Sequence, residues 1–379
     1  MSDELTDAQA PVRHLGRLRG RMAEEGMTAF LVRGTSNIQW LTAFDRVFDE
    51  EAAHALFVDQ GRAVLHTDSR YSEACRQAAE GTGILVNDVR EGHGAFAAKL
   101  WGHRFLPEAA DKLGIEDSIE LREYRALEKA FGEEGAPLPL RETDGVVLGL
   151  RAVKDPYEIA RMRRAQAITD AAFSHIVEFM APGMTERQVQ LELENFIVTH
   201  GADGLAFPSI VATGANGASP HAIPGETVLE AGQCVVLDFG ARFAGYCSDM
   251  TRTVFLGAPE GEMAAAWEAL RAANEAVEAM LAPGVTGAEA HQLAEDMLAE
   301  GGFGGKMGHG LGHGVGIDIH EQPVLSPRNP RPLAAGNVVT VEPGIYLPGR
   351  FGMRLEDFGV ITETGFDVFT GSTHEMVVI

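Results

Sequence analysis

The spacing of apolar residues in the first third of the chain predicts a small α/β unit. Leu15 to Glu25 carries its apolar residues with the 3.6-residue period of an amphipathic helix. Thr28–Val32 and Ala63–His66 are short apolar segments, bounded by polar residues, of the kind that form strands. Helices and strands are therefore both expected at this end of the chain.

The pattern changes around residue 150, where a long helix is predicted to begin. Asp155 is a good N-cap residue, Pro156 suits the first helical position, and Glu158 completes a capping box. We place a domain boundary just before this point. The expected domains are residues 1–146 and residues 147–379.

The second domain contains an internal repeat. Ala181–Thr185 and Ala282–Thr286 both read Ala-Pro-Gly-x-Thr, and each follows one amphipathic helix and precedes another. Thr185 and Thr286 are both expected to cap the helix that follows. Ala-Pro-Gly is also a common helix stop, but the repeated helices around it favour a duplicated unit. Two similar halves about a pseudo-two-fold axis would enclose a central cleft suited to a ligand.

Two acidic residues are predicted to face each other across a first hairpin. Asp238 lies at the end of an apolar strand, and Asp249 lies at the start of the returning strand. A turn centred between Phe243 and Ala244 would place the two carboxylates directly opposite, about 5 Å apart. At that distance like charges repel, so either one acid is protonated or a cation lies between them.

A second hairpin shows the same arrangement. Glu342 and Glu356 are equally distant from Gly349 in a Pro-Gly turn, within strands rich in Val, Ile and Leu. A single acid in a strand would usually face solvent. Two mirrored pairs in apolar strands instead favour a shared function, because an unpaired buried acid is costly.

The segment Gly308–Gly316 alternates glycine with other residues and is predicted to run extended rather than helical. His309 and His313 would then project to one face, and the bare glycine face would admit a second backbone or a substrate. His320 follows closely. A lone histidine is usually structural, but three within twelve residues beside such a glycine run favour a functional site.

Four carboxylates and one imidazole suit a pair of divalent ions such as Mn²⁺, Co²⁺ or Zn²⁺, bridged by carboxylates. A single zinc ion would normally use fewer acids. The three cysteines, Cys75, Cys234 and Cys247, lack the spacing of a thiolate site or a disulfide framework, which favours a reducing cytoplasm.

Composition and charge narrow the possible partners. The 379 residues are 45% hydrophobic and 23% charged, as expected for a folded chain. The 31 Lys and Arg against 55 Asp and Glu give a net charge of −24, which disfavours nucleic acid and anionic membranes as partners. The acidic start and the lack of a run of about 18 apolar residues argue against export or membrane insertion.

Six motifs, taken together and in order, resemble the pita-bread metallopeptidases of the creatinase, prolidase and aminopeptidase P branch. They are Asn216–His221, Leu237–Gly240, Ser248–Thr253, Gly312–Pro323, Val341–Gly344 and Arg354–Asp357, with a weaker match at Thr35–Phe44. The resemblance covers nearly the whole chain. It implies an α/β (α+β) fold, in which a small N-terminal creatinase-like domain precedes a C-terminal pita-bread domain with pseudo-two-fold duplication.

The resemblance also implies a set of site residues. The five ligands of a dinuclear centre would be Asp238, Asp249, His313, Glu342 and Glu356. Asp249 and Glu356 would bridge the two ions. Glu342 is the candidate proton shuttle, and the histidines outside the ligand set that would hold the substrate carbonyl and steady the oxyanion are His221, His309 and His320. Arg354 and Thr251 each lie two residues from a ligand, on the same strand face, so both could orient ligands from outside the centre.

The implied reaction is metal-dependent hydrolysis of the Xaa-Pro bond near a free N-terminus, with proline-containing peptides as substrates and a homodimer as the assembly. Aminopeptidase P and prolidase activities stay equally open, because they differ mainly in substrate length. Methionine aminopeptidase is disfavoured by the long N-terminal domain, and creatinase by the complete ligand set. The alternatives are a non-catalytic acidic pita-bread module that binds basic partners, or another C–N hydrolase of the same fold.

Overall fold

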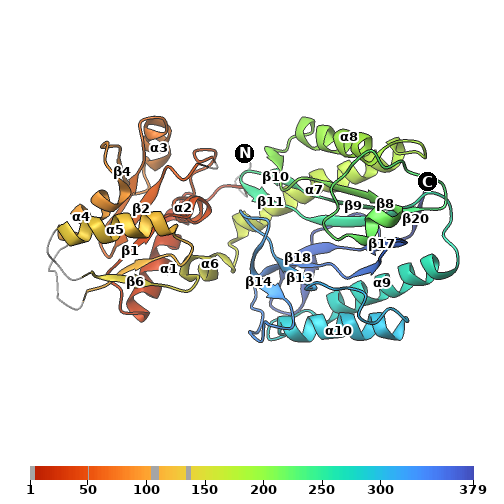
Figure 1. Ribbon diagram of the computed structural model, residues 1–379. Coiled ribbons are helices and arrows are strands. Elements are labelled where there is room, and N and C mark those ends of the chain that lie inside the picture. Colours follow the sequence, from red (N-terminus) through yellow and green to blue (C-terminus); the bar gives the residue numbers. More distant parts are fainter. Residues whose placement is uncertain (1–4, 50, 104–110, 134–137) are drawn as a thin grey trace. The chain divides into compact units, whose positions relative to one another are not determined.

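The computed structural model describes residues 5–49, 51–103, 111–133 and 138–379. The chain divides into two compact units (Figure 1). One consists mainly of Thr6–Arg151 and the other mainly of Ala152–Ile379. No helix among the described residues is both long and apolar enough to cross a membrane.

The N-terminal unit is a six-stranded mixed sheet with helices packed on it, in the order β4-β3-β2-β1-β5-β6. The strands are β1 (Ala29–Val32), β2 (Ala55–Asp59), β3 (Ala63–His66), β4 (Ile84–Asn87), β5 (Leu113–Ile115) and β6 (Leu140–Glu142). The helices are α1 (Ala10–Glu24), α2 (Thr35–Thr42), α3 (Ser72–Ala79), α4 (His93–Gly102), α5 (Leu121–Glu133) and α6 (Val146–Arg151). The predicted helix and both predicted strands are confirmed. The helix starts five residues earlier than expected, with a proline in its first turn.

The C-terminal unit contains two helix pairs and two main sheets. The helices are α7 (Pro156–Phe179), α8 (Glu186–Thr199), α9 (Gly261–Met280) and α10 (Gly287–Glu300). One sheet has the order β20-β12-β9-β8, formed by β8 (Ile210–Thr213), β9 (Cys234–Phe239), β12 (Met250–Phe255) and β20 (Val377–Val378). The other has the order β14-β13-β15-β18-β19, formed by β13 (Gly312–Gly314), β14 (Glu321–Leu325), β15 (Val338–Val341), β18 (Asp357–Ile361) and β19 (Phe366–Val368).

Smaller elements complete this unit. A three-stranded sheet joins β7 (Gly204–Leu205), β10 (Ala241–Phe243) and β11 (Tyr246–Cys247), and a two-stranded ladder joins β16 (Gly344–Leu347) and β17 (Phe351–Arg354). A 3₁₀ helix, η2 (Gly214–Ala218), follows β8. Helices α7 and α8 lie on one side of the strands, and α9 and α10 lie on the other (Figure 1).

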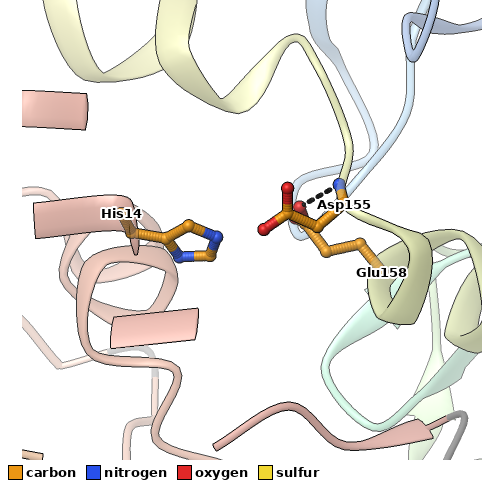
Figure 2. Close-up of side chains that lie close together, drawn as sticks. All are labelled: His14, Asp155 and Glu158. Carbon is orange, nitrogen blue, oxygen red and sulfur yellow. Dashed lines mark hydrogen bonds between the residues drawn. The ribbon is translucent and has the colours of Figure 1, made fainter. Parts of the chain in front are cut away.

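The long helix α7 begins where the sequence predicts. Asp155 and Glu158 form the expected capping box, in which the Asp155 backbone N–H donates to Glu158 Oε2 at 2.7 Å (Figure 2). Glu158 Oε1 accepts a hydrogen bond of 2.9 Å from the hydroxyl of Tyr246 on β11. The cap therefore also ties the start of α7 to the strands beside it.

The internal repeat predicted from the sequence is present as a repeated structure. Thr185 and Thr286 cap α8 and α10 with complete capping boxes, as expected. The turn before each cap is held in the same way: Gly183 donates to the carbonyl of Leu229 at 2.8 Å, and Gly284 to that of Leu333 at 2.9 Å. Each half also has its own core, one beneath α7 and α8 and one beneath α9 and α10.

Candidate metal centre

Nine of the ten predicted site residues, all except Thr251, line one cavity of about 510 Å³ in the C-terminal unit. They are His221, Asp238, Asp249, His309, His313, His320, Glu342, Arg354 and Glu356. They come from loops and strands of both halves, up to 135 residues apart in sequence (221 to 356). The fold therefore gathers the acids and histidines that the sequence motifs singled out.

Asp238 and Asp249 face this cavity, but their predicted direct pairing is wrong. In the ladder between β9 and β12, Asp238 lies opposite Thr251, which puts Asp249 level with Gly240. The hairpin turns one residue later than expected, at Ala244 and Gly245, which both have positive φ (47° and 82°). Moving the turn centre by one residue shifts each partner by two, so the two aspartates stay on the same face.

Gly240 makes this arrangement possible. A Cβ atom at that position would overlap the carbonyl oxygen of Ser248, so only glycine allows the two strands to approach so closely beside Asp249. Asp238 is 8% exposed and Asp249 is 4% exposed. The close approach of the strands thus leaves both carboxylates almost wholly inside the protein.

The predicted register of the second hairpin is confirmed. Val341 of β15 pairs with Asp357 of β18, and Gly344 of β16 pairs with Arg354 of β17, so one register runs through both ladders. Glu342 and Glu356 lie opposite each other in this register, between the end of one ladder and the start of the other. The backbone N–H of Glu356 also donates to the carbonyl of Thr251 at 3.1 Å, which joins the second hairpin to the first.

His313 lies on the short strand β13, and the predicted long extended run is wrong. Only Gly312–Gly314 form a strand, and Gly308 has a φ of +76°, a left-handed conformation that breaks the run. The glycine face behaves as expected within the strand. Added Cβ atoms at Gly312 and Gly314 would overlap the backbone oxygens of Thr340 and Gln322, so both neighbouring strands approach closely.

The five predicted ligands form a compact set of donors. His313 Nε2 lies 3.6 Å from Asp249 Oδ2 and 3.4 Å from Glu342 Oε1. Ligand atoms of Asp249, His313 and Glu356 all lie within 4.8 Å of one another. Asp238 Oδ1 and Glu356 Oε1 are buried and have no hydrogen-bond partner in the part of the chain that the structure describes. Buried orphan carboxylate oxygens are costly, and a divalent cation would satisfy them, so the donors fit a metal centre.

The protonation equilibria point the same way. Burial, together with repulsion from the neighbouring acids, raises the pKa of Asp249 and Glu356 well above the ordinary range. Burial, partly offset by Arg354, raises the pKa of Glu342 to about 8. Burial lowers the pKa of His313 to about 4, so its imidazole is neutral at pH 7 and keeps a lone pair for a ligand bond.

Comparison with known proteins identifies the family. Residues 160–363 match the model of metallopeptidase family M24, and residues 14–153 match the creatinase/prolidase N-terminal domain. The chain belongs to metallopeptidase family M24. An uncharacterized peptidase from Bacillus subtilis is 34% identical, over 96% of this chain and 99% of that protein.

Solved structures of the same fold extend this M24 assignment. A Xaa-Pro dipeptidase from Bacillus anthracis has 34% identity and a TM-score of 0.88, covering 97% of this chain and 100% of that chain. An X-Pro aminopeptidase from Thermotoga maritima has 32% identity and a TM-score of 0.83, covering 96% of this chain and 99% of that chain. The pita-bread architecture expected from the sequence is therefore confirmed.

Arg354 is the centre of a hydrogen-bond network in this M24 site. Its guanidinium donates to Asp238 Oδ2, to the hydroxyl of Thr251 at 2.9 Å and to that of Tyr346 at 2.9 Å. The Thr251 hydroxyl in turn donates to Glu356 Oε2 at 2.6 Å. Arg354 and Thr251 thus contact Asp238 and Glu356, each of which lies in a different segment from the residue that contacts it, rather than the acid two residues away in sequence.

Tyr346 is a site residue that the sequence reasoning missed. Its hydroxyl lies 3.0 Å from His309 Nε2, and His309 Nδ1 lies 2.7 Å from the carbonyl of Gly310. Burial lowers the pKa of His309 to about 4, so a neutral ring donates to Gly310 and accepts from Tyr346. The signal was available, because residues 342, 344 and 346 alternate onto one strand face.

The remaining cavity wall of this M24 protein is largely apolar and was also missed. Its apolar members are Phe207, Pro208, Ile210, Pro220, Ala222, Ile223, Pro224 and Ile319. Ile223 is 87% exposed, and His221 and His320 are exposed beside this wall. The rings of His320 and His313 meet edge to face, with centroids 4.4 Å apart. The cavity thus combines an acidic floor, an apolar wall and accessible imidazoles.

Proposed function

We propose that this protein hydrolyses the peptide bond before proline near a free N-terminus, using two divalent metal ions. The residues that would hold the ions are Asp238, Asp249, His313, Glu342 and Glu356. The observation that carries the proposal is the set of buried acids around one imidazole, in which Asp238 Oδ1 and Glu356 Oε1 have no hydrogen-bond partner among the described residues. Mn²⁺, Co²⁺ and Zn²⁺ all suit such donors.

When bound, the ions would polarise the scissile carbonyl and make water nucleophilic near neutral pH. The surrounding side chains bind the substrate, stabilise developing charge and transfer the proton. His221 and His320 hold the carbonyl oxygen of the substrate and stabilise the charge that develops on it. A Glu342 carboxylate oxygen accepts a proton from the attacking water and passes it to the leaving nitrogen. Arg354 keeps Asp238 in place.

The apolar wall accounts for the choice of proline. Phe207, Pro220 and Ile319 offer apolar surface for the pyrrolidine ring. The imide nitrogen of proline has no hydrogen to donate, so a site that requires no hydrogen bond from that nitrogen accepts it. Relatives named as a Xaa-Pro dipeptidase and as an X-Pro aminopeptidase both support this substrate class.

The proposal extends to a homodimer in the cytoplasm. All three cysteines are free and buried, which suits a reducing compartment. Light scattering of the purified protein tests the oligomeric state, and fractionation of the source cells tests the location.

A metal analysis combined with a peptide assay tests the proposed reaction. We expect two ions per chain and cleavage of Ala-Pro or Ala-Pro-Ala, with no cleavage of Ala-Ala-Ala under the same conditions. Comparing the two proline peptides separates dipeptidase from aminopeptidase activity. Dialysis against a chelator should abolish turnover, and Mn²⁺, Co²⁺ or Zn²⁺ should restore it. Full activity of the metal-free protein would contradict the proposal.

A further inference from the structure

A buried ion pair lies next to the turn between β13 and β14, which contains His320. Lys154 Nζ is 3.1 Å from Glu321 Oε2, and the two side chains are 1% and 2% exposed. Lys154 lies just before α7, and Glu321 is the first residue of β14. A fully buried lysine and glutamate cost much desolvation energy and are often replaceable by apolar residues, so this pair invites a functional explanation.

Glu321 holds the inside of the turn between β13 and β14. It pairs across the ladder with Gly314, the residue after His313. Its Oε1 atom accepts a hydrogen bond of 3.0 Å from the backbone N–H of Asp318. Its carboxylate lies against Gly316, where an added Cβ would be 2.5 Å from Oε1. The position of this carboxylate therefore determines the path of the turn.

The tip of the same turn is fixed by the first half of the unit. Arg242 Nη1 donates to the carbonyl of Ile317 at 2.8 Å, and the backbone N–H of Cys247 donates to the carbonyl of Gly316 at 2.8 Å. The tip is therefore held on one side by these hydrogen bonds, and Glu321 holds the turn on the other. His320 lies between the tip and Glu321 in the sequence, so its backbone has little freedom to move.

Lys154 is itself held by the segment that leads to Glu342. Its backbone N–H donates to the carbonyl of Gly336 at 2.8 Å, and Asn337 Nδ2 donates to the carbonyl of Ala152 at 2.9 Å. Val153 and Asn337 also form an isolated β-bridge. Asn337 immediately precedes β15, at whose end Glu342 lies. The ammonium group thus connects the strand of Glu342 to the turn of His320.

We propose that Lys154 is a positioning residue that holds His320 at the cavity by fixing the Glu321 carboxylate. Its role in turnover rests on the peptidase function proposed above. Without the ammonium, the buried Glu321 carboxylate loses the cation beside it. It then takes up a proton or moves toward water, and the hydrogen bond to Asp318 weakens. The turn relaxes, and His320 loses its place beside His313.

The test compares Lys154→Met with the double variant Lys154→Met/Glu321→Gln. Lys154→Met should keep its bound metal but lose about 10- to 100-fold in kcat, as is usual when the support of a site residue is removed. Hydrogen exchange should speed up at residues 316–321. In the double variant, the neutral amide that replaces the carboxylate still accepts from Asp318 without needing a cation. The double variant should therefore recover most of the protection against hydrogen exchange. Its kcat should be about tenfold higher than that of Lys154→Met.

A core variant separates positioning from simple destabilisation. Leu298→Ala, at a buried position of α10, should lower the melting temperature while leaving kcat and the exchange of residues 316–321 unchanged at a temperature where the protein is folded. The proposal is overturned if Lys154→Met keeps wild-type kcat and protection, or if the double variant is no better than the single one. A wild-type protein that cleaves no Xaa-Pro peptide would instead refute the proposed reaction, and the exchange data would still decide the role of Lys154.

Discussion

The two halves of the C-terminal unit share a frame but contribute different chemistry. In each half an Ala-Pro-Gly turn joins two helices, a threonine caps the second helix, and the pair covers a sheet. The first half contributes two aspartates, from β9 and from the residue before β12. The second contributes an imidazole and two glutamates, from β13 and from the level between two ladders. The frame is repeated, whereas the donors depend on the local backbone.

This difference shows where a duplicated fold can change without losing its core. The caps and turns of both halves form the same hydrogen bonds, since they serve the same helix packing. The segments that contribute the acids differ between the halves. The shorter aspartates come from β9 and from the residue before β12, whereas the longer glutamates come from a break between strands. The comparison predicts that ligand changes affect activity in either half, whereas frame changes affect only stability.

Removal of one donor from either half should have the largest effect. Asp249→Ala and Glu356→Ala should each lower kcat by at least about 10³-fold, because several kcal/mol of transition-state stabilisation are lost. Each variant should also bind fewer than two ions by elemental analysis. Asp367→Asn, at an exposed acid of β19, is the matched control and should change neither quantity. Retention of both ions in Asp249→Ala would contradict the shared centre.

The pH dependence of metal binding should be steep because ligand acids hold protons in the metal-free protein. The pKa of Glu342 is raised to about 8, so below that pH a proton must leave before the ligand binds. As the pH is lowered below about 8, metal affinity should therefore fall about tenfold per pH unit for each displaced proton. The folded metal-free protein binds this proton more tightly than the unfolded chain, so its stability should fall as pH rises from about 4.5 to 8. Titration calorimetry and denaturant melts measure both trends.

The hydroxyl of Thr251 connects the halves, so its removal should disturb both. Thr251→Val deletes the hydrogen bond to Glu356 and the acceptor for Arg354. We expect a loss of about 10- to 100-fold in metal affinity or kcat. Thr251→Ser keeps the hydroxyl and should retain most of the activity. Wild-type metal affinity and kcat in Thr251→Val would contradict a role for the hydroxyl.

The loss of stability on replacing glycine by alanine should differ between positions of the second half. Gly312→Ala should destabilise the protein by about 1 to 3 kcal/mol, because its Cβ would overlap the carbonyl of Thr340. Gly310→Ala, with 3.4 Å to the nearest atom, should cost less, and Gly365→Ala, with no neighbour within 4 Å, should be close to neutral. Chemical denaturation ranks the three variants.

The smallest effects should come from the shared frame. Thr185→Ala and Thr286→Ala each remove a helix cap and should each lower the free energy of unfolding by about 1 kcal/mol. Neither should change kcat, since both caps lie outside the cavity lining. A large drop in activity for only one of them would show that the halves are not equivalent as frames.

The two hairpins also show what the sequence can predict. Pro348 and Gly349 mark the second turn unambiguously, and the register that follows from them is correct. The first turn contains Ala244 with a φ of 47°, a conformation that alanine rarely adopts, so the predicted partners are two residues off. The starts of α7, α8 and α10 were predictable because capping is local.

Contacts between distant segments could not be predicted in this way. Tyr346 reaches His309 across 37 residues, and Lys154 reaches Glu321 across 167 residues. The apolar wall likewise draws on loops from both halves. Such partners depend on how the sheets pack, which neither periodicity nor spacing encodes. The candidate ligands could be proposed because they lie in compact motifs, but the residues that support them could not.

The unbroken register through β15–β18 and β16–β17 has a practical consequence for protein engineering. An exposed turn is normally the safest place to insert or delete residues. Here the residues between Leu347 and Phe351 act as a spacer, because their number sets which side chains align on the two arms. A single added residue would turn one glutamate away from the other. Libraries that vary this tip should therefore keep its length fixed and change only its composition.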